Sequence, residues 1–197
     1  MKDRFADKID DIDASVLRRL SKGKKAVFEF GTFAGASAMT MLPQIKAAGG
    51  HLWCIDHFHE DAYSPEATRI KPAEILGHLV ERVEPFRAHI TIIYGDISEA
   101  NNYPEGFADM VFIDASHSYS LVKRDIEIAL RLCRPGGTVC GHDYVQHYDD
   151  CDLEELETFA DIGSGFVNGV GYGVIKAVHE AFGTPNKEGA VWWVERD

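Results

Sequence analysis

The chain has 197 residues, of which 45% are hydrophobic, and a formal net charge of −12. This length suits one domain with a substantial core, so we expect residues 1–197 to form a single domain whose leading helix lies within residues 1–22. Phosphate backbones are bound by clustered Lys and Arg, so the acidic composition excludes nucleic acid as a main partner. A small-molecule partner suits this composition better.

No apolar run resembles a signal peptide, and none approaches the roughly 20 residues needed to cross a bilayer. We therefore expect a cytoplasmic protein with no membrane partner, and a homo-oligomer is compatible with the sequence. The four cysteines form no C-x-x-C pair, and we interpret them as reduced core or loop thiols rather than as metal ligands or nucleophiles: Cys54, Cys133, Cys140 and Cys151.

Hydrophobic periodicity predicts strands and helices that alternate along the chain. The predicted helices cover residues 9–21, 36–47, 73–83, 119–132 and 153–159, and residues 174–182 are expected to form a helix or a strand followed by a helix. Strands are predicted over residues 26–30, 51–55, 90–94, 109–113, 138–141 and 191–194. Such alternation predicts an α/β fold, a Rossmann-like doubly wound and mostly parallel sheet with helices on both faces.

The most informative segment follows the first predicted strand, and it reads Glu-Phe-Gly-Thr-Phe-Ala-Gly-Ala-Ser over residues 29–37. In an open parallel sheet, ligands bind beyond the carboxyl ends of the strands, where glycines let the backbone approach them closely. The segment lacks the G-x-G-x-x-G spacing and third glycine of a pyrophosphate site, which indicates a cofactor without phosphates. A tight structural turn is the alternative interpretation.

This segment resembles motif I of the class I S-adenosylmethionine (SAM) methyltransferases. The resemblance implies that Gly31, Gly35 and Ser37 hold the methionine part of SAM. Glu29 and Phe33 belong to the same segment, and we assign them to the cofactor site as well.

Acidic residues follow four successive predicted strands, at positions Asp56, Asp96, Asp114 and Asp143. The carboxyl ends of parallel strands share one edge of the sheet, so these side chains should lie near each other. An acid about 20 residues after the glycine turn commonly binds ribose hydroxyls, which makes Asp56 the predicted ribose ligand, with a loop-capping role as the alternative. Asp96 is assigned to the adenine, although Gly-Asp is also an ordinary turn. We expect Phe58 either to stack on the adenine or to anchor its loop.

A longer resemblance covers nearly the whole chain. It rests on VFIDASHSY at residues 111–119, on Asp125, on LCRPGG at residues 132–137 and on HDY at residues 142–144. The pattern is similar to that of the methyltransferase family that includes cephalosporin-type and macrolide-sugar O-methyltransferases, and more distantly to that of catechol-type O-methyltransferases. The resemblance implies a seven-stranded sheet whose last strand is antiparallel, with SAM as the cofactor.

In those relatives, the acid that ends strand four and two residues that end strand five hold a divalent cation. The matching positions are Asp114, which we also assign to the cofactor site, His142 and Asp143. Oxygen-rich sites favour Mg²⁺, and two carboxylates with an imidazole would equally suit Mn²⁺ or Fe²⁺. Catechol-type enzymes have a carboxylate and a carboxamide where this chain has His142 and Asp143, so metal dependence stays open.

His117 stands three residues after Asp114, where catechol-type enzymes have a catalytic lysine. An imidazole of near-neutral pKa can take a proton from an acceptor hydroxyl during methyl transfer. We predict His117 as the general base, with Asp114 in the same catalytic group and His142 as a competing candidate for the base.

Two polar loops, residues 57–72 and 145–168, flank the predicted acceptor pocket and are candidates for lids and for substrate selection. A dense run in the first loop is interpreted as a solvated lid rather than a metal site: His57, His59, Glu60 and Asp61. The sequence predicts a SAM-dependent methyltransferase, and within that class an O-methyltransferase of a small hydroxylated molecule such as a sugar, a phenol or a natural product. The alternatives are a non-catalytic SAM-binding module and an NAD-dependent oxidoreductase on a related fold.

Overall fold

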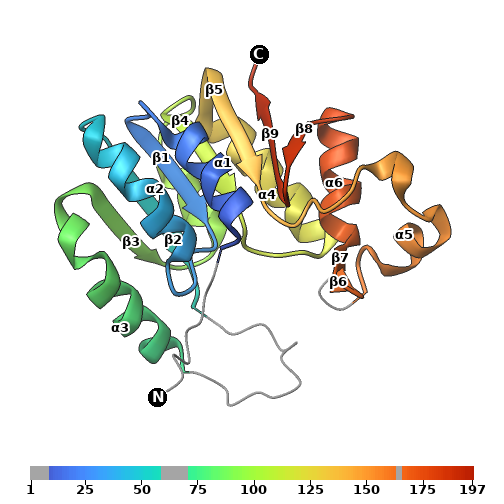
Figure 1. Cartoon of the computed structure of the whole chain (residues 1–197), viewed down its shortest axis with the longest axis horizontal. Helices are drawn as coiled ribbons and strands as arrows, with labels where there is room; N and C mark the ends of the chain where they lie inside the picture. The colour runs from blue at the N-terminus through green and yellow to red at the C-terminus, as the bar shows by residue number, and fades with distance from the viewer. Residues whose placement is uncertain (1–8, 59–70, 163–165) are drawn as a thin grey trace.

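The computed structural model describes residues 9–58, 71–162 and 166–197 (Figure 1). Its main sheet has seven strands in the order β3-β2-β1-β4-β5-β9-β8. These are β1 (Ala26–Phe30), β2 (His51–Asp56), β3 (Ile90–Tyr94), β4 (Ala108–Ile113), β5 (Cys133–Gly141), β8 (Asn186–Glu188) and β9 (Val191–Glu195). The first five strands pair in parallel, whereas β9 runs antiparallel to both β5 and β8. The predicted Rossmann-like sheet is therefore confirmed.

Helices cover both faces of this sheet (Figure 1). The α-helices are α1 (Asp11–Ser21), α2 (Ala36–Ala47), α3 (Pro72–Val83), α4 (Tyr119–Leu132), α5 (Leu153–Phe159) and α6 (Tyr172–Phe182). Three short 3₁₀-helices, η1 (Glu84–His89), η2 (Ile97–Asn102) and η3 (Tyr148–Asp150), lie in the connections. A separate two-stranded sheet pairs β6 (Phe166–Val167) with β7 (Val170–Gly171).

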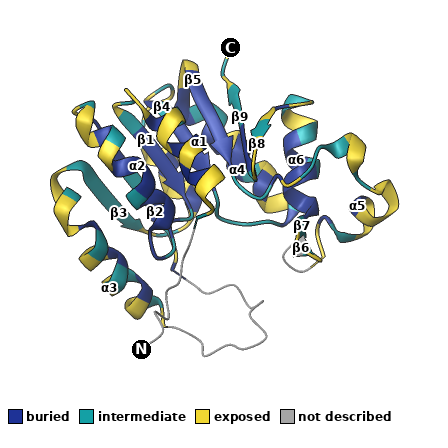
Figure 2. Ribbon diagram, in the orientation of Figure 1, coloured by how far each residue is buried: buried dark blue, intermediate teal, exposed yellow. Residues whose placement is uncertain are grey.

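The core has two parts, one on each face of the sheet, because successive side chains of a strand point to opposite faces. In β1, Val27 packs with the buried sides of α1, α2 and α3, whereas Phe28 packs with α4 and α6. Met110 and Val111 of β4 divide in the same way. Figure 2 shows the result, a buried sheet between helices whose exposed residues face outward. Burial on both faces is what the near-continuous apolar runs of these strands predict.

Strand β5 begins at Cys133, earlier than the predicted start at residue 138. Ala108 of β4 pairs with Cys133, and the register then shifts so that Met110 pairs with Thr138. The Pro-Gly-Gly segment at residues 135–137 is thus accommodated within an irregular strand. None of the described helices is long and apolar enough to cross a bilayer.

Candidate active site

The glycine turn lies between the carboxyl end of β1 and the start of α2. Gly31 and Gly35 have φ angles of 83° and 87°, which L side chains rarely adopt. A Cβ at position 31 would overlap the carbonyl oxygen of Asp114, and one at position 35 would stand 2.5 Å from Leu79 Cδ1. Both positions therefore require glycine, and the turn packs directly against the end of β4.

Behind this turn, Glu29 is fully buried and accepts hydrogen bonds from three side chains. Thr32 Oγ1 donates to it over 2.9 Å, Cys54 Sγ over 3.3 Å, and Ser37 Oγ also donates. Burial raises the pKa of Glu29 to about 7, although these hydrogen bonds act in the opposite direction. The Glu29 carboxyl thus ties both ends of the glycine turn to β1.

Asp56, the predicted ribose ligand, holds the backbone around the turn. Its Oδ2 accepts from the amides of Thr32 and Phe33, both over 2.7 Å, and its Oδ1 accepts from the amide of Phe58 over 2.5 Å. The side chain is 11% exposed. A carboxylate has about four acceptor sites, so Asp56 can hold these amides and still accept from a ligand hydroxyl.

Positive φ angles in non-glycine residues concentrate around the same rim of the sheet. Phe33, Phe58 and Asp143 have φ of 45°, 52° and 61°. Such strain persists only where the surroundings impose it, and it gathers at functional sites. Phe58 is fully buried and stacks on Tyr94 with a centroid distance of 5.9 Å, which agrees with the loop-anchor interpretation rather than with an exposed adenine platform.

Asp96 begins η2, where its Oδ1 accepts from the amide of Ser98 over 2.9 Å. Its other oxygen lies 3.3 Å from Arg124 Nη1. The hydrogen bond from Ser98 is the largest influence that lowers the pKa of this carboxyl, which is 53% exposed and so remains accessible to a ligand.

Three predicted residues meet at the ends of β4 and β5, namely Asp114, His117 and Asp143. One ligand atom from each lies within 4.8 Å of the others. His117 Nε2 is 2.7 Å from Asp143 Oδ2. Burial alone would raise the pKa of Asp143, but hydrogen bonds from His117 and His142 hold it well below its usual range. The ionised Asp143 therefore faces the ring of His117 and can orient it.

His142, which was predicted from the sequence as a metal ligand, does not belong to that group of three. Its Nε2 is 3.1 Å from Asp13 Oδ2, and its Nδ1 is 3.3 Å from Asp143 Oδ1 and 3.9 Å from Asp114 Oδ1. Burial opposes its charged form, but the hydrogen bond to Asp143 and the neighbouring carboxylates raise the pKa of His142 to about 10. Its two ring nitrogens are thus occupied by carboxylates.

Asp13 is a site residue that sequence reasoning missed. It is 5% exposed, and besides His142 it binds the amide of Ala190 over 2.8 Å through Oδ1. The available signal was its position, because Asp13 falls on the apolar face of the predicted first helix, between Ile12 and Val16. A carboxylate on the buried side of a helix requires a partner.

A cavity of about 260 Å³ lies between the start of α2 and the side chains of Asp13, Asp114 and His142. It is lined by Ile9, Asp10, Asp13, Ala36, Ser37, Asp114 and His142. His59, Glu60 and Asp61 of the first predicted lid lie outside the described residues, as do residues 163–165 of the second. His117 and Asp143 line a separate, much smaller cavity of about 10 Å³, and Asp114 and His142 line both cavities.

Comparison with known proteins places this geometry in a family. A family described as "Methyltransferase domain" matches residues 28–144, which is more than half of the chain. The sequence has no significant match among curated proteins.

Several solved structures have the same fold. A candidate O-methyltransferase from Klebsiella pneumoniae superposes with a TM-score of 0.66 at 18% identity, over 98% of this chain and 83% of that one. The O-methyltransferase from Bacillus cereus in complex with SAH gives 0.61 at 18% identity, over 97% and 84%. Cofactor-bound Rv0187 from MTB gives 0.65 at 15% identity, over 96% and 82%. The chain belongs to the family of methyltransferase domains.

Proposed function

We propose that this protein uses SAM to methylate a hydroxyl group of a small molecule. The observation that carries the proposal is the placement of the Gly31–Gly35 turn and the Asp114, His117 and Asp143 group around one rim of the sheet. The first suits a cofactor without phosphates, and the second suits removal of a proton from an acceptor hydroxyl. The O-methyltransferase from Bacillus cereus, solved with SAH, supports this choice through its shared fold.

The chain offers a matching partner for each part of SAM. Helix α2 begins at Gly35 without a side-chain cap, so its positive end suits the carboxylate of the methionine part, beside Ser37. Asp56 lies at the end of β2, where it can accept from ribose hydroxyls, and the partly exposed carboxylate of Asp96 suits the adenine amine. The buried pair of Glu29 and Thr32 holds the turn in the shape that admits the cofactor.

His117 is our general base. Its ring is held by Asp143 at 2.7 Å, which sets the ring orientation and stabilises the imidazolium that forms when the ring takes a proton. A sulfonium is already a strong electrophile, so the protein's contribution is to align the acceptor oxygen and to remove its proton. His142 does not suit the role of base, because its raised pKa leaves it protonated at neutral pH.

Asp114, His117 and Asp143 also fit a divalent cation, because two carboxylates and an imidazole form a donor set that Mg²⁺, Mn²⁺ or Fe²⁺ accepts. A bound cation would orient an acceptor oxygen and lower its pKa. His117 would then serve as a ligand instead of a base. The structure favours His117 over His142 for this role, since both nitrogens of His142 face carboxylates.

Calorimetric titration with SAM, with and without Mg²⁺ and after chelation, tests the proposal. We expect binding near 1 μM, about −8 kcal/mol, and transfer of a labelled methyl group to a member of a panel of sugars and phenols. Absence of SAM binding under every condition would overturn the cofactor assignment. Tight SAM binding without turnover on any acceptor would favour the non-catalytic binding module instead.

A further inference from the structure

The segment of residues 142–144 follows β5 and carries two side chains of the candidate site, His142 and Asp143. Asp143 has a φ of 61°, a left-handed conformation that a non-glycine residue keeps only where its neighbours impose it. Its Oδ2 lies 2.7 Å from Nε2 of His117, so the backbone that holds Asp143 also decides how the ring of His117 is oriented. The contacts that hold this segment therefore set the geometry of the candidate base.

Asp13 of α1 holds the first side chain of this segment. Its Oδ2 lies 3.1 Å from Nε2 of His142, and Nδ1 of the same ring lies 3.3 Å from Oδ1 of Asp143. An ionised carboxylate only accepts hydrogen bonds, so a ring that lies between two carboxylates donates from both of its nitrogens. His142 thus links the position of Asp143 to that of the Asp13 carboxylate.

Asp13 also holds the last residue of the segment, through the backbone of Ala190. Asp13 Oδ1 accepts from the Ala190 amide over 2.8 Å, and the Ala190 carbonyl oxygen accepts from the Tyr144 amide over 3.0 Å. Ala190 lies in the turn between β8 and β9, where Gly189 has a φ of 62°. A Cβ at position 189 would overlap Asp13 Oδ1, so the turn requires glycine to admit the carboxylate. One carboxylate therefore fixes residues 142–144 at both ends.

Burial distinguishes Asp13 from an ordinary acid on the surface of a helix. Asp13 is 5% exposed, whereas Asp11 of the same helix is exposed. Burying a carboxylate is costly, and a neutral acceptor would bind the Ala190 amide at a smaller cost of desolvation. The carboxylate at this position is accounted for by His142, whose ring donates on both sides and requires an acceptor on each.

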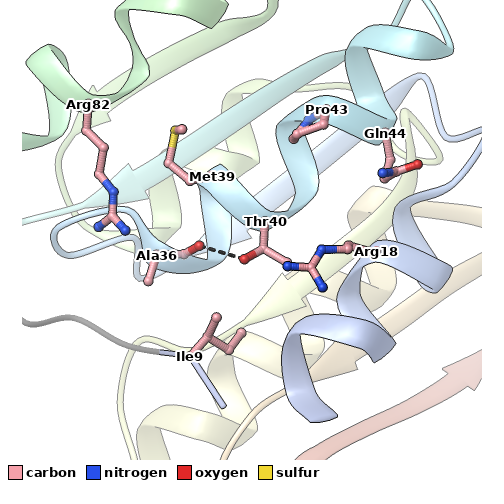
Figure 3. A pocket seen from close by; sticks show the side chains of 8 residues that line it. All are labelled: Ile9, Arg18, Ala36, Met39, Thr40, Pro43, Gln44 and Arg82. Carbon is pink, nitrogen blue, oxygen red and sulfur yellow. Dashed lines mark hydrogen bonds between the residues drawn. The ribbon is translucent and has the colours of Figure 1, made fainter. Parts of the chain in front are cut away.

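The packing of α1 against α2 sets the position of Asp13. The two helices lie side by side, and a cavity of about 440 Å³ opens beside them (Figure 3). Ile9, just before α1, and Ala36, at the start of α2, line this cavity and also the cavity of about 260 Å³ that Asp13 and His142 border. The beginning of α1 thus forms part of the wall of the candidate site, and the helix presents Asp13 to His142.

We propose that Asp13 is a positioning residue for methyl transfer. It holds His142 and Asp143 in place, and Asp143 in turn orients the ring of the candidate base. This inference rests on the proposed function, because it gives Asp13 a part in the reaction as well as in folding. In this role Asp13 touches no reacting atom, and its effect on turnover passes through His142.

Asp13→Asn in the whole chain tests the role, because it keeps the size of the side chain and an oxygen for the Ala190 amide. Its NH₂ group then faces the donating ring of His142, so the link to Asp143 is lost. We expect kcat for methyl transfer to fall by about 10–100-fold, as is typical for partners that orient a functional group, while KM for SAM stays unchanged. Asp11→Asn is the matched control, which removes the same charge from the exposed side of α1, and it should keep kcat. An unchanged kcat in Asp13→Asn would overturn the proposal.

A double-mutant cycle separates this role from a general loss of stability. If Asp13 acts through His142, Asp13→Asn should lower kcat by about 10-fold or more in the wild type but by less than about 2-fold in a His142→Gln background. Equal losses in both backgrounds would overturn the proposal, because they would show that Asp13 affects turnover independently of His142.

NMR provides a readout that needs no methyl acceptor. The ring ¹⁵N chemical shifts of His117 report its contact with Asp143, and we expect Asp13→Asn to change them and Asp11→Asn to leave them unchanged. Unchanged His117 shifts in folded Asp13→Asn would overturn the positioning role. Absence of methyl transfer by the wild type with every acceptor would instead contradict the proposed function, and the shifts would still decide whether Asp13 positions His117.

Discussion

The carboxyl group of Glu29 has a raised pKa, and its hydrogen bonds hold both ends of the glycine turn. Its pKa rises from 4.5 to about 7 on folding. Between these values the native protein holds a proton that the unfolded chain releases, so stability falls as pH rises from 4.5 to about 7 and then levels off. The loss at this residue is roughly 3 kcal/mol at most.

Glu29→Gln should remove this pH dependence, because the amide stays neutral at every pH and keeps an oxygen for Ser37 or Thr32. Chemical denaturation at pH 5 and pH 7.5 measures the change. We expect the free energy of unfolding to differ less between the two pH values in the variant than in the wild type. Equal differences in both proteins would show that Glu29 does not titrate in this range.

His117→Asn tests the base. If His117 takes the proton of the acceptor, kcat should fall by about 10²–10⁴-fold at neutral pH while the affinity for SAM stays the same. His51→Asn is the control and should keep the activity. His51 lies at the start of β2, at the opposite end of the strand from the candidate site, and its ring forms a hydrogen bond with Thr91. Retention of full activity in His117→Asn would exclude His117 as the base.

Mn²⁺ binding decides whether His117 serves as a metal ligand instead of a base. Calorimetry with the metal alone should show binding that Asp114→Asn weakens by about 10-fold or more, because the substitution removes an anionic ligand. His117→Asn should weaken it as well, while Asp96→Asn should not. Equal Mn²⁺ affinity in the wild type and Asp114→Asn would contradict the metal site.

At the scale of single residues, the candidate site was predictable wherever strand ends carry acids. Asp114, His117 and Asp143 lie next to strands that are visible in the sequence, so their meeting follows from the parallel sheet. The sequence could not show that His117 points towards Asp143 while His142 points towards Asp13. The rotamers of His117 and His142 decide that arrangement, and a rotamer depends on the side chains packed around it.

The glycine turn is the element on which the cofactor site depends. Gly31→Ala combines a φ of 83° with an overlap between the new Cβ and the Asp114 carbonyl oxygen. We expect it to lower the free energy of unfolding by about 3 kcal/mol or more, or to prevent folding. Gly49→Ala, at a φ of 68° with nothing within 4 Å, should cost only about 1–2 kcal/mol. Equal losses in chemical denaturation would show that the close approach to β4 is unimportant.

Among the elements, the regular ones were predicted and the irregular ones were not. The predicted helices over 36–47 and 119–132 are confirmed as α2 and α4, because glycines flank the first and a clear apolar period marks the second. The strands β6, β7 and β8 were missed, since two or three residues are too few to show a period, and the 3₁₀-helices of three to six residues were missed as well. The early start of β5 was missed because Pro and Gly usually end a strand.

At the scale of the whole molecule, Asp13 connects the two ends of the fold. It binds Ala190, which precedes β9, and His142, which follows β5, from a helix near the start of the chain. Asp13→Ala should lower the free energy of unfolding by about 2–4 kcal/mol, because it leaves the amide of Ala190 and the Nε2 of the charged His142 without their acceptor. Asp11→Ala, on the exposed side of α1, should cost below about 1 kcal/mol. Similar losses in thermal or chemical unfolding would contradict this role of Asp13.

The sequence by itself determined the class of fold, the strand ends that carry the candidate site and the methyltransferase assignment, because these depend on local periodicity and on short motifs. The sheet order confirms the class of fold, and the family match confirms the methyltransferase assignment. Only the tertiary structure decided that Asp13 lies beside His142 and that His117 joins the carboxylates. These contacts join residues far apart in the chain, and their formation depends on how the helices pack against the sheet.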